Sequence, residues 1–282
     1  MTLRADILAT LPRVEAVMNY LTPMAERPRN YTFEPPAGVP RSNIVSDPHP
    51  LAIHSMRPVA DLVSLDANGF ALIDAKSAVR DFFDDDEVRR VYYPEVERAI
   101  KQATGADRVH IFDHTVRRRV PGSADRGGGP RQPVQRVHID HTARSGPQRV
   151  RDLLPDDAPE LLKGRVQVIN LWRPIVGPLL DSPLAVCDAT TVDPKDLVPS
   201  DLVYQHRVGE TYSVAFSPDH RWYYVPRMQP DEALLIKCSD TSTAVPARFT
   251  PHSAFVDPTT PADAPPRQSI EVRTLVFHKA PS

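Results

Sequence analysis

Proline is the residue that most limits what this chain can fold into. The sequence contains 31 prolines among 282 residues, well above the average share of about 5%. Proline interrupts helices and is excluded from the interior of central strands. We therefore expect a chain with many turns and long ordered loops.

Short apolar and β-branched runs, separated by turn residues, dominate the second half of the sequence. They cover residues 166–172, 184–188, 201–204, 211–216, 222–225, 233–237 and 269–277. Many short strands without intervening helices favour an antiparallel barrel or jelly roll. We expect a single domain over residues 1–282, mainly β with flanking helices, with the β core in residues 137–282.

Residues 1–136 are expected to support this core with helices and strands. Helical spacing of apolar residues predicts an amphipathic helix over 4–20, and one long helix or two short ones over 77–103, broken near Pro94. Short strands are expected at 59–62, 69–73 and 109–113. The proline-rich stretch 22–58 predicts an extended surface arm, which could also form a homo-oligomer contact. Residues 117–136 form either a solvated connector or a lid over a site.

Composition excludes several classes of function. A net charge of −2 gives no electrostatic reason to expect nucleic acid or an anionic membrane as a partner. No apolar run reaches membrane-spanning length, and the N-terminal residues lack a signal-peptide pattern, so we expect a cytoplasmic protein. Cys187 and Cys238 are expected to be buried thiols rather than a disulfide.

The sequence Val137-His138-Ile139-Asp140-His141-Thr142 follows the Gly/Pro-rich loop in a β-type setting. On a strand, His138 and Asp140 point to the same face, whereas His141 points to the other. An imidazole and a carboxylate side by side make two-thirds of the 2-His-1-carboxylate triad that binds Fe(II). Alone, this pair is more often structural than metal-binding.

The third ligand must come from a histidine downstream. The candidates are His141, His206, His220, His252 and His278. Of these, His252 is followed by Arg267-Gln268-Ser269, in which two polar side chains share a strand face. Oxygenases that use a 2-oxo acid need a planar cation, with help from a hydroxyl, to bind the distal carboxylate. The order His138-x-Asp140, His252, Arg267-x-Ser269 therefore indicates an iron site.

The segment from His138 to Phe277 resembles the non-haem iron, 2-oxoglutarate-dependent family of GA4-desaturase-like and cephamycin-hydroxylase-like hydroxylase/desaturases of secondary metabolism. The matching pieces are residues 137–142, 170–175, 181–188, 222–228, 231–237, 251–255 and 267–273. The resemblance implies a double-stranded β-helix (jelly-roll, cupin-like) core, with Fe(II) at His138, Asp140 and His252. It also implies 2-oxoglutarate and O2 as co-substrates. The expected reaction is hydroxylation, desaturation or oxidative cyclisation of a small molecule, with succinate and CO2 as co-products.

The anchor for 2-oxoglutarate is open at this stage. Arg267 with Ser269 is the first choice, and Arg273 and Arg248 are rivals. Asn170 and Arg173 could also bind 2-oxoglutarate or a substrate carboxylate, next to a Trp172 that fits the barrel core equally well. Two other functions compete with an oxygenase: a zinc- or manganese-dependent hydrolase or isomerase, and a non-catalytic barrel that binds a small molecule.

Overall fold

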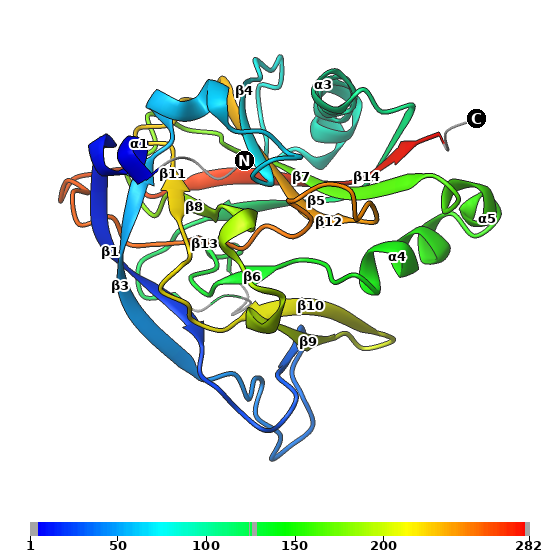
Figure 1. The fold of residues 1–282 in the computed structure, drawn as a ribbon, viewed down its shortest axis with the longest axis horizontal. Coiled ribbons are helices and arrows are strands. Elements are labelled where there is room, and N and C mark those ends of the chain that lie inside the picture. Colours follow the sequence, from blue (N-terminus) through cyan, green and yellow to red (C-terminus); the bar gives the residue numbers. More distant parts are fainter. Residues whose placement is uncertain (1–4, 124, 126–128, 280–282) are drawn as a thin grey trace.

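Two facing β-sheets form the protein in a computed structural model that describes residues 5–123, 125 and 129–279 (Figure 1). The larger sheet has nine strands within these residues. Their order is β1 (Arg13–Leu21), β3 (Ser46–Ser55), β11 (Trp222–Tyr224), β8 (Leu184–Cys187), β13 (His252–Ala254), β6 (His138–Ile139), β10 (Val208–Val214), β9 (Leu197–Val203) and β2 (Arg29–Tyr31).

The smaller sheet has five strands in the described part of the chain. Their order is β4 (Phe70–Asp74), β12 (Glu232–Asp240), β7 (Arg165–Pro174), β14 (Gln268–His278) and β5 (Arg108–Arg118). Neighbouring strands are antiparallel except for the pairs β11–β3 and β2–β9. All seven strand runs expected after residue 165 are present, and the mainly β, jelly-roll class is confirmed.

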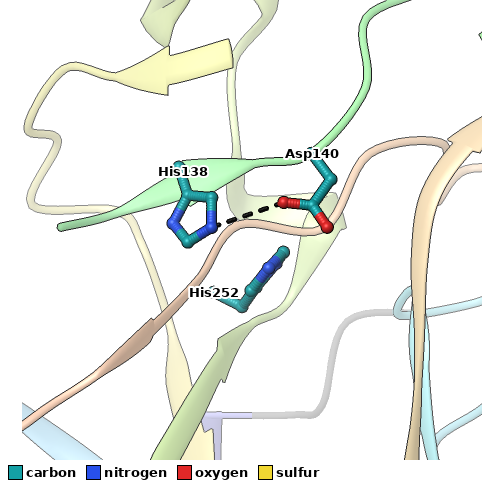
Figure 2. Close-up of side chains that lie close together, drawn as sticks. All are labelled: His138, Asp140 and His252. Carbon is teal, nitrogen blue, oxygen red and sulfur yellow. Dashed lines mark ion pairs between the residues drawn. The ribbon is translucent and has the colours of Figure 1, made fainter. Parts of the chain in front are cut away.

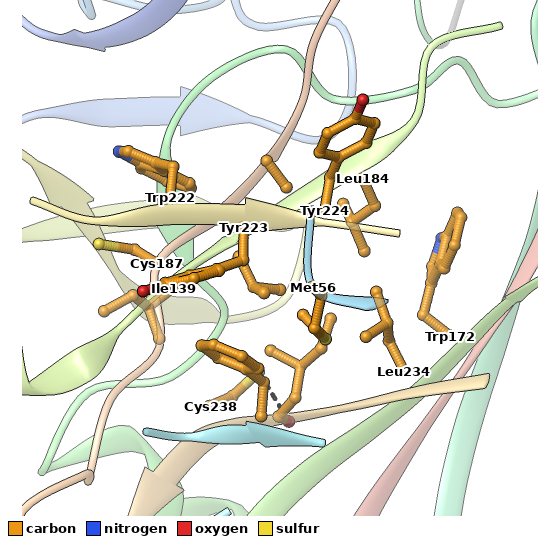
Figure 3. Close-up of a cluster of buried hydrophobic side chains, with 14 of the residues drawn as sticks. Met56, Ile139, Trp172, Leu184, Cys187, Trp222, Tyr223, Tyr224, Leu234 and Cys238 are labelled. Atoms are coloured by element: carbon orange, nitrogen blue, oxygen red, sulfur yellow. Dashed lines mark hydrogen bonds between the residues drawn. The ribbon is translucent and has the colours of Figure 1, made fainter. Parts of the chain in front are cut away.

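The space between the two sheets is filled by apolar side chains from both (Figure 3). Ile139 and Trp222 come from the larger sheet, and Trp172, Leu234 and Cys238 from the smaller one. Burying each such side chain contributes about 1.5–3 kcal/mol to folding, so this core fixes how the sheets face each other.

The other face of the smaller sheet is also covered. Ile169 and Leu171 of β7 point away from the first core and pack with Val96 and Ile100 of helix α3 (Tyr93–Thr104). Figure 1 shows α3 lying over β7, β14 and β5. Alternate residues of β7 therefore enter two different cores, which explains why this strand is apolar almost throughout.

The helices predicted over 77–103 are confirmed from residue 85 onward. α2 (Asp85–Glu87) passes through a π-helical turn, Val88–Tyr92, into α3. Asp84 caps α2 by accepting hydrogen bonds from two backbone N–H groups. Pro94 lies in the first turn of α3, where a missing N–H costs nothing, and it does not break the helix.

Three expectations for the N-terminal part are wrong. Only α1 (Ala5–Thr10) of the helix over 4–20 forms; β1 follows it and pairs with β3 along its whole length. Ala16, Met18 and Tyr20 are buried at every second position, which suits a strand. The stretch 22–58 is not simply a surface arm, since β3 lies inside the larger sheet. Residues 57–62 form a 3-10 helix rather than a strand.

The remaining helices are short, and those between β6 and β7 were not expected. They are α4 (Ser145–Leu153), α5 (Ala158–Leu161) and the 3-10 turns Ala189–Thr191 and Pro194–Asp196. In the described part of the chain, no helix has the length and apolar character needed to cross a bilayer.

Residues 117–136 begin at the end of β5 and continue as irregular chain. Residues 124 and 126–128 of this expected connector or lid lie outside the described residues. Gln132 holds the base of the segment, because its side chain bonds to Val120 N, Arg118 O and Pro130 O. Whether the segment acts as a lid stays a prediction.

The two cysteines are free and buried, as expected. Burial raises the pKa of the Cys187 thiol and of the Cys238 thiol. Both side chains therefore stay neutral and serve as small apolar groups in the core.

A buried lysine near the end of β12 forms a cluster of ion pairs. Lys237 Nζ donates to Asp66 Oδ1 at 2.6 Å, Asp240 Oδ2 at 2.8 Å and the Ala247 carbonyl at 3.1 Å. Arg165 bridges the same two carboxylates. Every ammonium hydrogen thus has an acceptor, which a fully buried charge requires.

Replacing Lys237 by Met should lower the free energy of unfolding by about 3 kcal/mol, because breaking a buried ion pair leaves carboxylates without their partner. Urea denaturation measures this change. The matched control is Lys163→Met, which removes an exposed pair with Glu160 and should change stability by less than about 0.5 kcal/mol. Equal effects for the two variants would contradict this account of the Lys237 cluster.

Candidate metal centre

His138, Asp140 and His252 meet in space although His252 lies more than a hundred residues further along the chain. Their ligand atoms all lie within 4.8 Å of one another (Figure 2). Strand pairing brings them together: β6 is antiparallel to β13, and His138 is the register partner of His252. Asp140 follows β6 directly, with its Oδ1 3.5 Å from His138 Nε2.

Backbone carbonyls set the tautomers of both histidines. His138 Nδ1 lies 2.7 Å from the Arg136 carbonyl and His252 Nδ1 lies 3.1 Å from the Thr250 carbonyl. A carbonyl can only accept, so each Nδ1 carries the proton and each Nε2 presents a lone pair. Burial, followed by the repulsion that a protonated His138 would exert, lowers the pKa of His252, which keeps this imidazole neutral.

The loop before His252 is held by a close backbone approach. Thr250 donates its hydroxyl to the Gly69 carbonyl at 2.9 Å. Gly69 has a φ of 92°, and a Cβ at this position would collide with the Thr250 hydroxyl. Glycine is needed there, and the contact fixes the carbonyl that orients His252.

The second oxygen of Asp140 is held by the smaller sheet. Asn170 Nδ2 donates to Oδ2 at 2.8 Å and Arg273 Nε donates to it at 3.2 Å. Burial alone would raise the pKa of Asp140, but His138 and the charge of Arg273 hold that pKa well below its usual value. The residue is therefore a carboxylate, with Oδ1 turned toward the two imidazoles.

His141 is not part of this group. Its Nδ1 lies 3.3 Å from Ser145 Oγ and its ring meets the Phe112 ring edge-on. The expectation that strand alternation turns it away from His138 agrees with this position, although β6 itself ends at Ile139. Burial lowers the pKa of His141 to about 4, so it is neutral.

A small cavity of about 30 Å³ opens beside the three side chains. It is lined by Arg117, Val134, His138, Asp140, Trp172, Leu184, His252, Arg267, Glu271 and Arg273. This volume holds only a few water molecules.

Arg267, the first choice for the 2-oxoglutarate anchor from the sequence, lines this cavity. Its Nε donates to Ser269 Oγ at 3.1 Å and its Nη1 to the Ser182 carbonyl at 2.7 Å. The guanidinium carbon lies 5.0 Å from the Trp172 ring centre. Among the described residues it forms no ion pair with a carboxylate, so its charge is available to an anion. Ser269 supports Arg267 and does not itself line the cavity.

A second guanidinium, which sequence reasoning missed, faces the same space. Arg117 on β5 is the register partner of Ser269, and its Nη1 donates to the Gln132 carbonyl at 2.7 Å. Burial, and then the charge of Arg117, lower the pKa of Arg267 to about 9. Both arginines remain charged at neutral pH, and together with Arg273 they outnumber the lining carboxylates Asp140 and Glu271 by one.

Arg273 and Arg248, the alternative anchors for 2-oxoglutarate, differ from Arg267 in their partners or their position. Arg273 lines the cavity but is neutralised by Glu271, Asp113 and Asp140. Arg248 donates Nε to the Asp240 carbonyl and does not line the cavity.

Asn170 and Arg173, predicted to bind 2-oxoglutarate or a substrate carboxylate, have other positions. Asn170 faces the metal centre, where it holds Asp140 and Glu271. Arg173 lies on the opposite face of β7, donates to the Ala75 carbonyl and lines a different cavity. The structure therefore does not bring Arg173 to the metal centre.

Glu271 is a further residue that the sequence analysis missed. It accepts from Asn170 through Oε1 and from Arg273 through Oε2, so it stabilises both groups that hold Asp140. The signal was present: residues 269, 271 and 273 of β14 are polar, whereas Ile270 and Val272 between them pack into the second core.

Two neutral imidazoles and one carboxylate, on one side of a cavity and with their other atoms already hydrogen-bonded, fit Fe(II) in a facial triad. The buried Oδ1 of Asn170 has no hydrogen-bond partner within the described residues, and it lies next to the carboxylate that would bind the metal.

The comparisons with known proteins agree with this chemistry. A protein-family model described as "Oxidoreductase/YMDC permease-like domain" matches residues 18–277. The Fe(II)/2-oxoglutarate-dependent dioxygenase nvfI of Aspergillus novofumigatus is 35% identical over 254 residues, which cover 88% of this chain and 90% of that protein. The hydroxylase/desaturase efuI of Hormonema carpetanum is 33% identical over 287 residues, covering 94% and 95% of the two chains.

A solved structure shows the same likeness in three dimensions. The iron and alpha-ketoglutarate-dependent endoperoxidase NvfI superposes on this chain with a TM-score of 0.86 at 32% identity. The superposition covers 95% of this chain and 99% of the other.

Replacing Asn170 by Ala should lower the affinity for Fe(II) by about 10- to 100-fold, the usual effect of removing a group that orients a metal ligand. Anaerobic calorimetric titration with Fe(II) measures it. Asn30→Ala, at the edge of the larger sheet, is the control and should bind iron as the unmodified protein does. Unchanged affinity in Asn170→Ala would show that Asp140 does not need this hydrogen bond.

Proposed function

This chain belongs to the Fe(II)/2-oxoglutarate-dependent dioxygenases, and we propose that His138, Asp140 and His252 hold its iron. The observation that carries the proposal is the convergence of these three side chains, with both Nε2 atoms and Asp140 Oδ1 facing one another. Fe(II), 2-oxoglutarate and O2 are the cofactor and co-substrates of the family, and the chain is an oxidoreductase.

With iron bound, the centre supplies the oxidising chemistry that converts a substrate C–H bond, while 2-oxoglutarate becomes succinate and CO2. The protein contributes position and charge. Asn170 and Arg273 keep Asp140 ionised and fixed in orientation. Trp172 and Leu184 contribute an apolar wall to the cavity.

Arg267 is proposed as the anchor for the distal carboxylate of 2-oxoglutarate. It lines the cavity beside the metal ligands, is buried, and has no carboxylate partner among the described residues. Ser269 and the Ser182 carbonyl hold its guanidinium in place. An anion entering here would relieve the cost of a buried unpaired charge.

The substrate is proposed to be a small molecule of specialised metabolism, which the names of the relatives support. Hydroxylation, desaturation and ring closure all fit the centre. Arg117 on β5 lines the same cavity as residues from β6, β7, β13 and β14, which supports a single catalytic domain. Assembly into a homo-oligomer through residues 22–58, the absence of nucleic-acid and membrane partners and a cytoplasmic location stay predictions.

The competing functions have less support. A zinc- or manganese-dependent hydrolase or isomerase could use the same three ligands, and a non-catalytic barrel could bind a small molecule. Neither explains two buried arginines facing the metal ligands, and the relatives are dioxygenases.

Arg267→Lys should raise the KM for 2-oxoglutarate by about 10- to 100-fold, because a lysine cannot form the bidentate pair worth about 1.5–3 kcal/mol. The KM comes from succinate release at varied 2-oxoglutarate. Arg248→Lys is the matched control and should leave the KM unchanged. An increase confined to Arg248→Lys would move the anchor to that residue.

Anaerobic addition of Fe(II) and 2-oxoglutarate to the unmodified protein should produce a weak visible metal-to-ligand band. His252→Ala should lose this band and the release of succinate, since the third ligand is missing. His206→Ala, a histidine not grouped with the candidate ligands, should keep both. Metal analysis showing zinc, with no band in the unmodified protein, would favour the hydrolase or isomerase.

A further inference from the structure

A second and larger cavity, of about 230 Å³, lies on the other side of the smaller sheet. Its floor is formed by Leu171 and Arg173 of β7, and its wall by Tyr92, Glu95 and Val96 at the start of α3. Trp172, between the two floor residues, points the opposite way and lines the metal cavity. The two cavities are therefore separated by the thickness of one strand.

Arg173 is an unusual residue to find on such a floor. Only 3% of it is exposed, yet within the described residues no carboxylate lies at ion-pair distance. Its Nη1 donates to the Ala75 carbonyl at 2.6 Å, and its Nε has no hydrogen-bond partner. The guanidinium carbon lies 5.5 Å from the Phe82 ring centre and 5.6 Å from that of Tyr92.

Two partly buried arginines of this protein show what a structural role looks like. Arg165 bonds two carboxylates, and Arg273 bonds three. A buried guanidinium that lacks such partners lowers the stability of the folded protein unless an anion binds to it. Two aromatic rings beside Arg173 stabilise its charge only in part.

Two further buried polar atoms at the same cavity have no hydrogen-bond partner within the described residues, although one of them lies close enough to Arg173 for that guanidinium to lower its pKa. They are the Tyr92 hydroxyl and Glu95 Oε2, whereas Glu95 Oε1 accepts from Ala78 N at 2.9 Å. Burial raises the pKa of Tyr92, so its hydroxyl stays protonated and can donate. Tyr92 ends the π-helical turn Val88–Tyr92, a distortion often found at functional sites.

We propose that this cavity, which nothing in the oxygenase reaction requires, binds a small carboxylate that also carries a hydroxyl or ammonium group. The carboxylate would accept from Arg173 Nε and the Tyr92 hydroxyl. The donor group of the ligand would reach Glu95 Oε2. Exposed Lys76 and Arg98 at the rim give the lining a net positive charge, since only Asp74 and Glu95 oppose the three cations.

The test uses 3,3,3-trifluorolactate, which has a carboxylate, a hydroxyl and a fluorine signal. The full-length protein is loaded with zinc and saturated with 2-oxoglutarate, so that the metal cavity is filled. Broadening of the fluorine resonance reports binding. Arg173→Met should weaken binding at least tenfold, and Tyr92→Phe, which keeps the ring, about three- to tenfold.

Arg248→Met is the matched control, because it removes an arginine that lines neither cavity and should leave the broadening as it is. The Tyr92→Phe result stands even if Arg173→Met fails to fold. The proposal is overturned if the unmodified protein causes no broadening, or if Tyr92→Phe binds as tightly as the unmodified protein. It is also overturned if Arg267→Met, which changes the metal cavity, loses the signal while Arg173→Met keeps it. This last result would assign the probe to the metal cavity.

Discussion

The carboxylate of Asp140 is the point at which the two sheets meet, and the geometry of the metal centre depends on it. Asp140 follows a strand of the larger sheet, whereas the groups that hold its Oδ2, Asn170 and Arg273, belong to the smaller sheet. These hydrogen bonds connect the sheets at one place. They also leave a single oxygen free to face the imidazoles, which is what a monodentate ligand requires.

The arginines at the two ends of the polar face of β14 have different partners, and this difference gives one a structural role and the other a binding role. Arg267, directly before β14, and Glu271 and Arg273 of the strand line the metal cavity. Arg273 is surrounded by carboxylates, so it can only support its neighbours. Arg267 has a hydroxyl and a carbonyl as partners and keeps an uncompensated charge. Arg117 adds a second such charge from the adjacent strand, which makes the cavity suited to an anion.

Both faces of the smaller sheet are buried, so consecutive residues of β7 lie in different surroundings and have different roles. Asn170 and Trp172 face the metal centre, while Leu171 and Arg173 lie under the helical layer. A one-residue step along β7 therefore moves a side chain from the reaction site to a separate cavity. The same covering by α3 that completes the second core also creates that cavity.

Local sequence was enough to predict the strands after residue 165 and the position of His138 and Asp140 on the same face. Both predictions depend only on turn residues and on the alternation of side chains, which can be recognised from neighbouring residues. It also identified His252 and Arg267, through their order and the residues around them. It misassigned 13–20 as part of a helix over 4–20, since Val14, Val17, Met18 and Leu21 recur at helical spacing. Pairing with β3 selects a strand instead, which buries Ala16, Met18 and Tyr20.

Other parts of the site lie beyond any local pattern. Which face of β7 meets the metal could not be read where both faces are buried, so Asn170 and Arg173 were given the same task. The contributions of Arg117 and Glu271 depend on which strands become neighbours. The sequence by itself determined the kinds of ligand and their order along the chain. The tertiary structure decided which of them meet, because strand register and sheet packing join residues that are far apart in sequence.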